Sequence, residues 1–158
     1  MKNFGPPLKI GIISDTHGLL RPEIFDVFED VDHILHAGDI CDDDILKNLA
    51  EIAPVAAVRG NSDTTPGCRR LPLFDIVKLS SAEAYLCHGH IESFNCIPSG
   101  VNLLVSGHTH QPRIESLGGI LRINPGSAGP RRPGVPVSVG IVTIYNKARS
   151  AQIIELPV

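Results

Sequence analysis

The most informative feature of the sequence is a series of short motifs rich in Asp, His, Asn and Gly. In chain order the motifs read DTHG, GD, GNSD, HGH and GHTH. Carboxylate oxygens and imidazole nitrogens are donors for Mn, Ni, Fe, Zn or Co ions, and manganese is our first expectation. A lone GD or GN is usually a simple turn, but the ordered set predicts a site for two divalent ions. The candidate metal ligands are Asp15, His17, Asp39, Asn61, His88, His108 and His110.

The spacing within the motifs allows neighbouring ligands to reach one site. Asp15 and His17 are two residues apart, as are His108 and His110, so in extended backbone both members of a pair can point the same way. Asp39 would be shared by two ions about 3.5–4 Å apart. A glycine precedes Asp39, Asn61 and His108, and we expect it to let the backbone turn tightly there.

The elements that must position these residues are strands that end where the motifs begin. Apolar runs predict strands over 8–14, 33–39 and 54–61, with helices over 22–30 and 42–52 between them. This β-α-β-α-β order predicts parallel strands with crossover helices. Because ligands of open α/β sheets gather outside the carboxyl ends of the strands, the motifs should meet at one edge.

The second half of the chain is richer in strands. We expect them over 73–79, 83–89, 102–110, 112–117, 120–127, 137–146 and 151–157. Gly118 and Gly119 separate two of them and predict a hairpin turn. The length suits one domain over residues 1–158. The expected architecture is α/β, a two-sheet β-sandwich flanked by helices.

The composition limits the kinds of partner that the protein is expected to bind. The formal net charge is −3, which disfavours a nucleic-acid binder. No apolar stretch approaches the roughly 20 residues that span a bilayer, and the N-terminus lacks a signal-peptide profile. The four cysteines form no CxxC pair, so we expect a cytoplasmic protein with reduced thiols and no membrane partner.

On these motifs the sequence resembles the calcineurin-like metallophosphoesterases, in particular the small single-domain prokaryotic phosphodiesterases. The resemblance runs from Lys9 to about Ser127 and implies a four-layer α/β/β/α fold with a dinuclear site. It also implies a turn beneath the site at NPGS, residues 124–127. Enzymes that it resembles usually carry a helix between residues 90 and 101, where this chain is short.

The resemblance also implies a role for each ligand. Asp15, His17 and His110 would bind the first metal, whereas Asn61, His88 and His108 would bind the second, with Asp39 bridging both. A metal-bridging hydroxide would attack the phosphorus of a small phosphate ester. Asn61 would give its amide oxygen to the metal and turn its NH₂ toward the phosphate, so Asn61 and Asp39 are expected to be catalytic as well.

The sequence departs from its relatives at the proton donor. Many relatives carry His directly after the metal-binding Asn, but here that residue is Ser62, which is too weakly acidic to protonate a leaving group. Asp63, which would orient that His, then lacks its usual partner. We expect a preference for esters with good leaving groups, such as aryl phosphodiesters. His90 is a candidate replacement donor, and a surface or supporting imidazole is the alternative.

Two other functions stay open at this point. A non-catalytic protein-interaction scaffold of the same fold is the first, although every expected ligand is present here. A nuclease is the second, and no basic stripe supports it. Arg131 and Arg132 lie in a Pro/Gly loop as solvated charges or as contacts to a substrate phosphate. A homodimer or higher homo-oligomer is the expected assembly.

Overall fold

The structure is a computed structural model that describes residues 5–91 and 97–158. Its helices are α1 (Glu23–Val27), α2 (Asp43–Ala50) and the 3₁₀ helix η1 (Cys68–Arg70). Its strands are β1 (Leu8–Ile13), β2 (His33–His36), β3 (Val55–Ala57), β4 (Phe74–Leu79), β5 (Ala82–Cys87), β6 (Leu103–Val105), β7 (Arg113–Leu117), β8 (Ile120–Asn124), β9 (Ser138–Tyr145) and β10 (Ala148–Glu155).

The strands form two five-stranded sheets of mixed direction. The first sheet has the order β10-β9-β1-β2-β3, and the second has the order β4-β5-β6-β8-β7. The parallel pairs are β1–β2 and β2–β3 in the first sheet and β5–β6 and β6–β8 in the second. Alternate residues of both sheets bury Ile12, Leu35, Leu86 and Val105 in a shared core between them. The predicted α/β two-sheet sandwich is confirmed.

The helices cover the outer face of the first sheet. Ile24 of α1 and Phe28, which directly follows the helix, pack against β1, where Gly11 lets the Phe28 ring approach the backbone closely. Asp42 caps the start of helix α2, because its side chain accepts a hydrogen bond from the Asp44 N–H at 2.9 Å. The α1 helix is shorter than the range 22–30 predicted, because the chain turns toward β2 directly after Phe28.

The outer face of the second sheet differs. Tyr85, Cys87 and Leu104 form a small cluster there, and Phe74 stacks on Tyr85 while its own side chain stays 55% exposed. Among residues 5–91 and 97–158 no helix lies on this face. Residues 92–96, in the segment where relatives were expected to carry a helix, lie outside the described residues.

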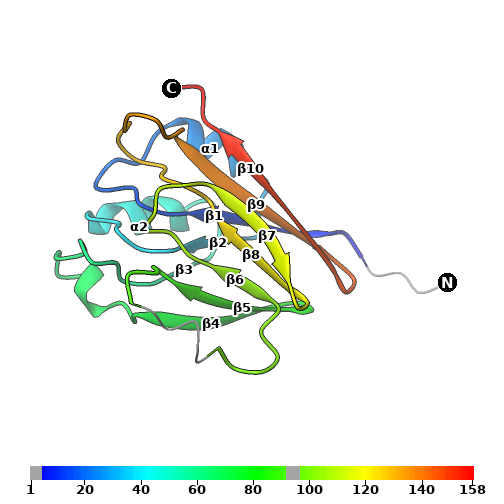
Figure 1. The fold of residues 1–158 in the computed structure, drawn as a ribbon. Helices are drawn as coiled ribbons and strands as arrows, with labels where there is room; N and C mark the ends of the chain where they lie inside the picture. The colour runs from blue at the N-terminus through cyan, green and yellow to red at the C-terminus, as the bar shows by residue number, and fades with distance from the viewer. Residues whose placement is uncertain (1–4, 92–96) are drawn as a thin grey trace.

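Tight turns lie at one end of the sandwich and the motif loops at the other. The β4–β5, β7–β8 and β9–β10 hairpins and the N-terminus lie to the right in Figure 1, and the loops after β1, β2 and β3 lie to the left. Gly118 and Gly119, both at positive φ, form the predicted two-residue turn between Leu117 and Ile120. Strand β10 begins at Ala148, three residues before its predicted start. No helix in the described part of the chain is long and apolar enough to cross a membrane.

Candidate metal centre

Five strands end beside the seven candidate ligands, as the sequence predicted. Asp15 and His17 follow β1, Asp39 follows β2, and Asn61 follows β3. From the second sheet, β5 leads directly into His88, and the loop after β6 carries His108 and His110. Both sheets present these carboxyl ends on the same side of the molecule (Figure 1). The seven residues therefore lie near one another.

Two carboxylate oxygens lie at the centre of the cluster. Asp15 Oδ1 lies 3.3 Å from His110 Nε2 and 3.6 Å from His17 Nε2. Asp39 Oδ2 lies 3.5 Å from His17 Nε2 and 3.3 Å from His88 Nε2. One oxygen of Asp39 therefore faces ring nitrogens from both halves of the predicted site.

The other half of the cluster is built from an amide and two imidazoles. Asn61 Oδ1 lies 3.0 Å from His88 Nε2 and 3.1 Å from His108 Nδ1. His88 Nδ1 donates to the Ala37 carbonyl at 2.8 Å, so in the neutral ring Nε2 carries only its lone pair. Nε2 and Asn61 Oδ1 then both offer lone pairs to the space between them, an arrangement that suits a shared cation.

The two buried carboxylates are held from behind. Asp15 Oδ2 accepts hydrogen bonds from Ser14 Oγ at 2.6 Å and from the His108 N–H at 3.1 Å, which leaves Oδ1 for the centre. Asp39 Oδ1 accepts from the Ser62 N–H at 2.8 Å, which leaves Oδ2 for the centre. In both side chains one oxygen is fixed and the other points at the imidazoles.

Backbone strain concentrates at the ligands. Within the described residues, eight that are not glycine have positive φ, a region that L-residues disfavour. Five of the eight are candidate ligands: Asp15, His17, Asp39, His108 and His110, with φ between 44° and 70°. Unfavourable backbone angles that gather in this way are typical of functional sites.

Two glycines of the motifs are required for close packing rather than for their φ. A Cβ at Gly107 would overlap Ser14 Oγ and lie 2.7 Å from Asp15 Oδ2. A Cβ at Gly60 would overlap Asp39 Oδ1. We expected tight turns at these positions, and the structure adds that each glycine touches a ligand carboxylate or its anchor.

Asp63 has a role that the sequence reasoning missed. Its carboxylate is almost fully buried and accepts hydrogen bonds from four backbone N–H groups, at 2.7–3.0 Å. The four donors are Asp39, Ile40, Cys41 and Gly60. Asp63 therefore fixes the loop that carries Asp39, whereas the sequence suggested an acid without a partner. Its place in GNSD was the only signal.

A second supporting chain starts at His36. The fully buried ring accepts from the Gly38 N–H through Nδ1 at 3.2 Å and lies 3.1 Å from Thr16 Oγ1 through Nε2. Thr16 Oγ1 in turn donates to the Ile40 carbonyl at 3.1 Å. Burial lowers the pKa of His36 to about 4, so the ring is neutral and joins the loops after β1 and β2.

The turn at NPGS supports the ligand loops, as expected. Asn124 Nδ2 donates to the Gly107 carbonyl at 2.9 Å and to Thr109 Oγ1 at 3.0 Å. Ser127 Oγ donates to the Asp15 carbonyl at 3.1 Å. The turn thus contacts the backbone on both sides of His108 as well as that of Asp15.

The electrostatics keep both carboxylates ionised. Burial alone would raise the pKa of Asp39, but hydrogen bonds from His88 and the Ser62 N–H outweigh it and lower the pKa to about 2. The pKa of Asp15 is also lowered, because contacts with His17 and Ser14 outweigh burial. In His88, burial opposes protonation, yet Asp39 and Asp15 raise the pKa. The cluster is thus anionic and attracts positive charge.

The described residues fit divalent ions. Asp15 Oδ1, His17 Nε2 and His110 Nδ1 are buried polar atoms with no hydrogen-bond partner, which is costly unless another group satisfies them. Potential ligand atoms of Asp15, His17 and His110 all lie within 4.8 Å of one another, as do those of Asp15, Asp39 and His88. Oxygen and imidazole donors in this number suit Mn, Fe, Zn, Ni or Co.

His90 lies beside the imidazole half of the cluster. Its ring centroid is 5.3 Å from that of His88 and 6.3 Å from that of His108, and its Nδ1 is buried without a partner. Burial and the charges of those two rings lower its pKa, so the ring is neutral at pH 7. A neutral imidazole still carries one ring N–H but is a weak acid, so the role of His90 as a proton donor stays a prediction.

Comparison with known proteins agrees with this geometry. The model of the calcineurin-like phosphoesterase superfamily domain matches residues 8–147. The chain is 39% identical over 159 residues to a probable metallophosphoesterase of Methanothermobacter thermautotrophicus, covering 92% of this chain and 91% of the relative. It is 30% identical over 168 residues to a phosphodiesterase of Methanocaldococcus jannaschii, covering 94% of this chain and all of the relative.

A solved structure shows the same fold at lower sequence similarity. Vacuolar protein sorting 29 from Cryptosporidium parvum matches with a TM-score of 0.75 over 95% of this chain and 98% of its own, at 20% identity. At that identity the likeness concerns the fold alone.

Proposed function

The chain belongs to the calcineurin-like phosphoesterase superfamily and is a metal-dependent phosphoesterase, and from this premise we propose that it is a dinuclear phosphodiesterase of small phosphate esters with good leaving groups. The observation that carries the proposal is the position of Asp39. Its Oδ2 lies within 3.5 Å of His17 Nε2 and within 3.3 Å of His88 Nε2, so one oxygen can serve two ions.

Each half of the cluster would hold one ion. Asp15, His17 and His110 would hold the first, Asn61, His88 and His108 the second, and Asp39 would contact both. When bound, two divalent ions polarise phosphoryl oxygens and lower the pKa of coordinated water. Two divalent ions bring four positive charges, whereas Asp15 and Asp39 bring two negative charges. The loaded site is therefore net positive and favours an anionic phosphate ester.

The side chains of this chain would orient the ester. The Asn61 NH₂ donates to Ser62 Oγ at 3.4 Å, which is a weak contact, and it could turn to a phosphoryl oxygen. Ser62 holds Asp39 through its backbone N–H and offers no acidic proton. With His90 neutral as well, the leaving group departs without a strong proton donor, which supports the preference for acidic alcohols such as aryl groups.

The experiment is a rate and metal measurement on one protein sample. We expect about two metal ions per chain, with manganese the most activating among Mn, Ni, Fe, Zn and Co. We expect faster hydrolysis of bis-p-nitrophenyl phosphate than of p-nitrophenyl phosphate, and a steep fall in rate as leaving-group pKa rises. Asp39→Asn should abolish hydrolysis, whereas Asp44→Asn on the exposed surface of α2 is the matched control. One ion per chain, or full activity in Asp39→Asn, would contradict the proposal.

The same experiment separates the alternative of a non-catalytic protein-interaction scaffold of the same fold. A scaffold would show no hydrolysis of aryl esters with any of the five metals. Cleavage of plasmid or oligonucleotide would instead favour a nuclease. The cytoplasmic location and a homo-oligomeric state stay predictions, to be checked by fractionation and by light scattering.

A further inference from the structure

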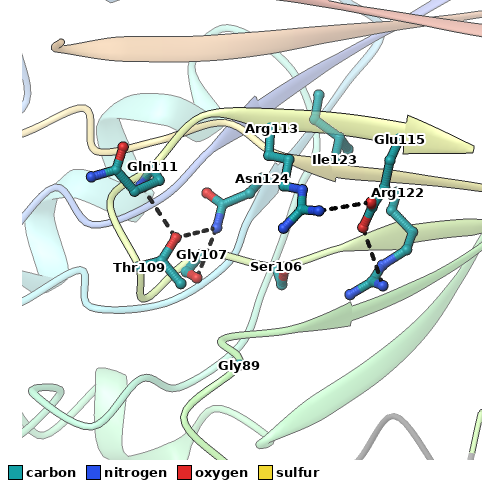
Figure 2. A pocket seen from close by; sticks show the side chains of 10 residues that line it. All are labelled: Gly89, Ser106, Gly107, Thr109, Gln111, Arg113, Glu115, Arg122, Ile123 and Asn124. Atoms are coloured by element: carbon teal, nitrogen blue, oxygen red, sulfur yellow. Dashed lines mark hydrogen bonds and ion pairs between the residues drawn. The ribbon is translucent and has the colours of Figure 1, made fainter. Parts of the chain in front are cut away.

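The loop between β8 and β9 lies beside the metal centre and takes no direct part in the proposed reaction. Strand β8 runs parallel to β6, whose carboxyl end leads to two of the ligands, and β9 runs antiparallel to β1. Residues 125–137 therefore connect the two sheets at the same end as the ligand loops (Figure 1). Asn124, after which the loop begins, donates to Thr109 and to the Gly107 carbonyl (Figure 2).

The first residues of this loop are joined to the first half of the metal centre. Ser127 Oγ donates to the carbonyl of the ligand Asp15 at 3.1 Å. Gly129 packs against the next residue along, since a Cβ there would overlap the Thr16 carbonyl oxygen. Arg21 Nε also donates to the Gly129 carbonyl, at 3.0 Å. The loop thus leaves the sheets in direct contact with the segment that carries Asp15.

A tight turn then fixes the backbone of Arg132. Arg132 and Val135 pair as an isolated bridge, and the Val135 N–H donates to the Arg132 carbonyl at 3.4 Å. Between them lie Pro133 and Gly134, with Gly134 at φ 77°, which is the pattern of a type II turn. Arg132 lies three residues after Gly129, so their Cα atoms are at most about 11 Å apart. The turn and this short connection keep Arg132 near the first half of the centre.

The guanidinium group of Arg132 is available to an anion. It is exposed, and within residues 5–91 and 97–158 it donates no hydrogen bond and forms no ion pair. Its charge nevertheless reaches the metal centre, because burial and the charge of Arg132 lower the pKa of the ligand His110 against the opposing effect of Asp15. Guanidinium groups suit phosphoryl oxygens, because their planar N–H donors match the geometry of a phosphate.

We propose that Arg132 is a substrate-binding residue that donates to a non-bridging oxygen of the scissile phosphate, on the His110 side of the centre. The inference rests on the proposed function and adds to it a protein contact that no metal ligand supplies. Negative charge gathers on the phosphoryl oxygens as the ester reacts, so the contact should be stronger in the transition state than in the bound ester. Loss of Arg132 should therefore lower kcat as well as raise KM.

The test compares hydrolysis of bis-p-nitrophenyl phosphate by the metal-loaded parent and three variants. Loss of a charge-assisted hydrogen bond in Arg132→Ala should lower kcat/KM by about 10–100-fold. Arg132→Lys keeps the charge without the planar donors and should recover only part of that loss. Arg131→Ala is the matched control, because it removes the same charge from the adjacent residue, which points to the opposite side in extended backbone. It should stay within about twofold of the parent.

Binding measurements separate contact with the substrate from support of the ligands. In calorimetry, inorganic phosphate should bind metal-loaded Arg132→Ala about tenfold more weakly than the parent, with the same number of metal ions per chain. Unchanged phosphate affinity, or equal rates for Arg132→Ala and Arg131→Ala, would overturn the inference. Loss of metal together with activity would assign Arg132 a supporting role and overturn it as well. Absence of hydrolysis by the parent would instead overturn the proposed function.

Discussion

The two halves of the metal centre are anchored in opposite ways. In the half formed by Asp15, His17 and His110, the carboxylate is fixed by two hydrogen bonds, whereas His17 Nδ1 makes a long contact of 3.8 Å with the Cys41 thiol. In the other half, His88 is the fixed ligand, fully buried and bonded to the Ala37 carbonyl at 2.8 Å.

In each half of the site, therefore, one ligand is held more rigidly than the others: Asp15 in the first half and His88 in the second. Asp39 joins the two halves, and its own loop is fixed by Asp63. Ligands that are held in place from behind bind metal tightly, because binding need not first order them. We therefore expect unequal consequences when matched residues of the two halves are changed.

The largest effect should come from the imidazoles themselves. His88→Ala removes a fixed ligand and should reduce kcat/KM for an aryl phosphodiester by roughly 1000-fold, whereas His17→Ala should reduce it by roughly 100-fold. Metal titration of both variants by calorimetry, beside steady-state rates, measures the difference. Equal losses, or a larger loss for His17→Ala, would remove the distinction between the halves.

The second-largest effect should come from a change at Asp63, which holds the loop of Asp39, the ligand that joins the two halves. Asp63→Asn keeps the size of the side chain but replaces one of the two acceptor oxygens with an NH₂ group. The four backbone N–H groups that now share two oxygens would then have only one. We expect about 2 kcal/mol lower free energy of unfolding and a 10–100-fold lower rate. Urea unfolding of the metal-free protein measures the first quantity. An unfolding midpoint equal to that of the parent would show that Asp63 does not support the loop.

A smaller effect should appear in acid, at the segment that follows Asn61. Asp43 accepts hydrogen bonds from Thr65 Oγ1 and from the N–H groups of Gly67 and Cys68, and these lower its pKa to about 2 from the ordinary 3.8. Its contribution to stability is therefore complete above about pH 4 and is lost as the pH falls toward 2.

Thermal unfolding of the metal-free protein between pH 5 and 2 tests this prediction. Asp43→Asn cannot ionise, so its melting temperature should fall less steeply in that range than that of the parent. Parallel curves for the two proteins would exclude the assigned role of Asp43.

The smallest effect should come from the thiol beside His17. Burial raises the pKa of Cys41 to about 11, so the group is a neutral thiol, and its contact with His17 is long. We expect Cys41→Ala to change the rate and the metal affinity by less than about threefold. A loss as large as that of His17→Ala would mean that the thiol orients the ring.

Much of this site could be predicted from the sequence, because residue type and strand ends are local properties. The motifs placed Asp15 after β1 and His88 after β5 without knowledge of the fold. Three of the four partners of Asp63 could not be predicted, because they are backbone N–H groups of a loop more than 20 residues away. The requirement for glycine at position 107 could not be predicted either, because it depends on Ser14, which follows a strand of the other sheet and would overlap a Cβ there. The position of Arg132 depends on how the loop between β8 and β9 packs against Thr16, which no motif reports.

The left-handed backbone at five ligands has a consequence for how this protein could change. Such a conformation costs roughly 1–2 kcal/mol per residue for side chains with a Cβ. Glycine would relieve that cost at each position and remove the ligand at the same time. A descendant released from catalysis would therefore gain stability through the substitutions that silence it. At these five positions we therefore expect substitution by glycine to raise stability and lower metal binding together.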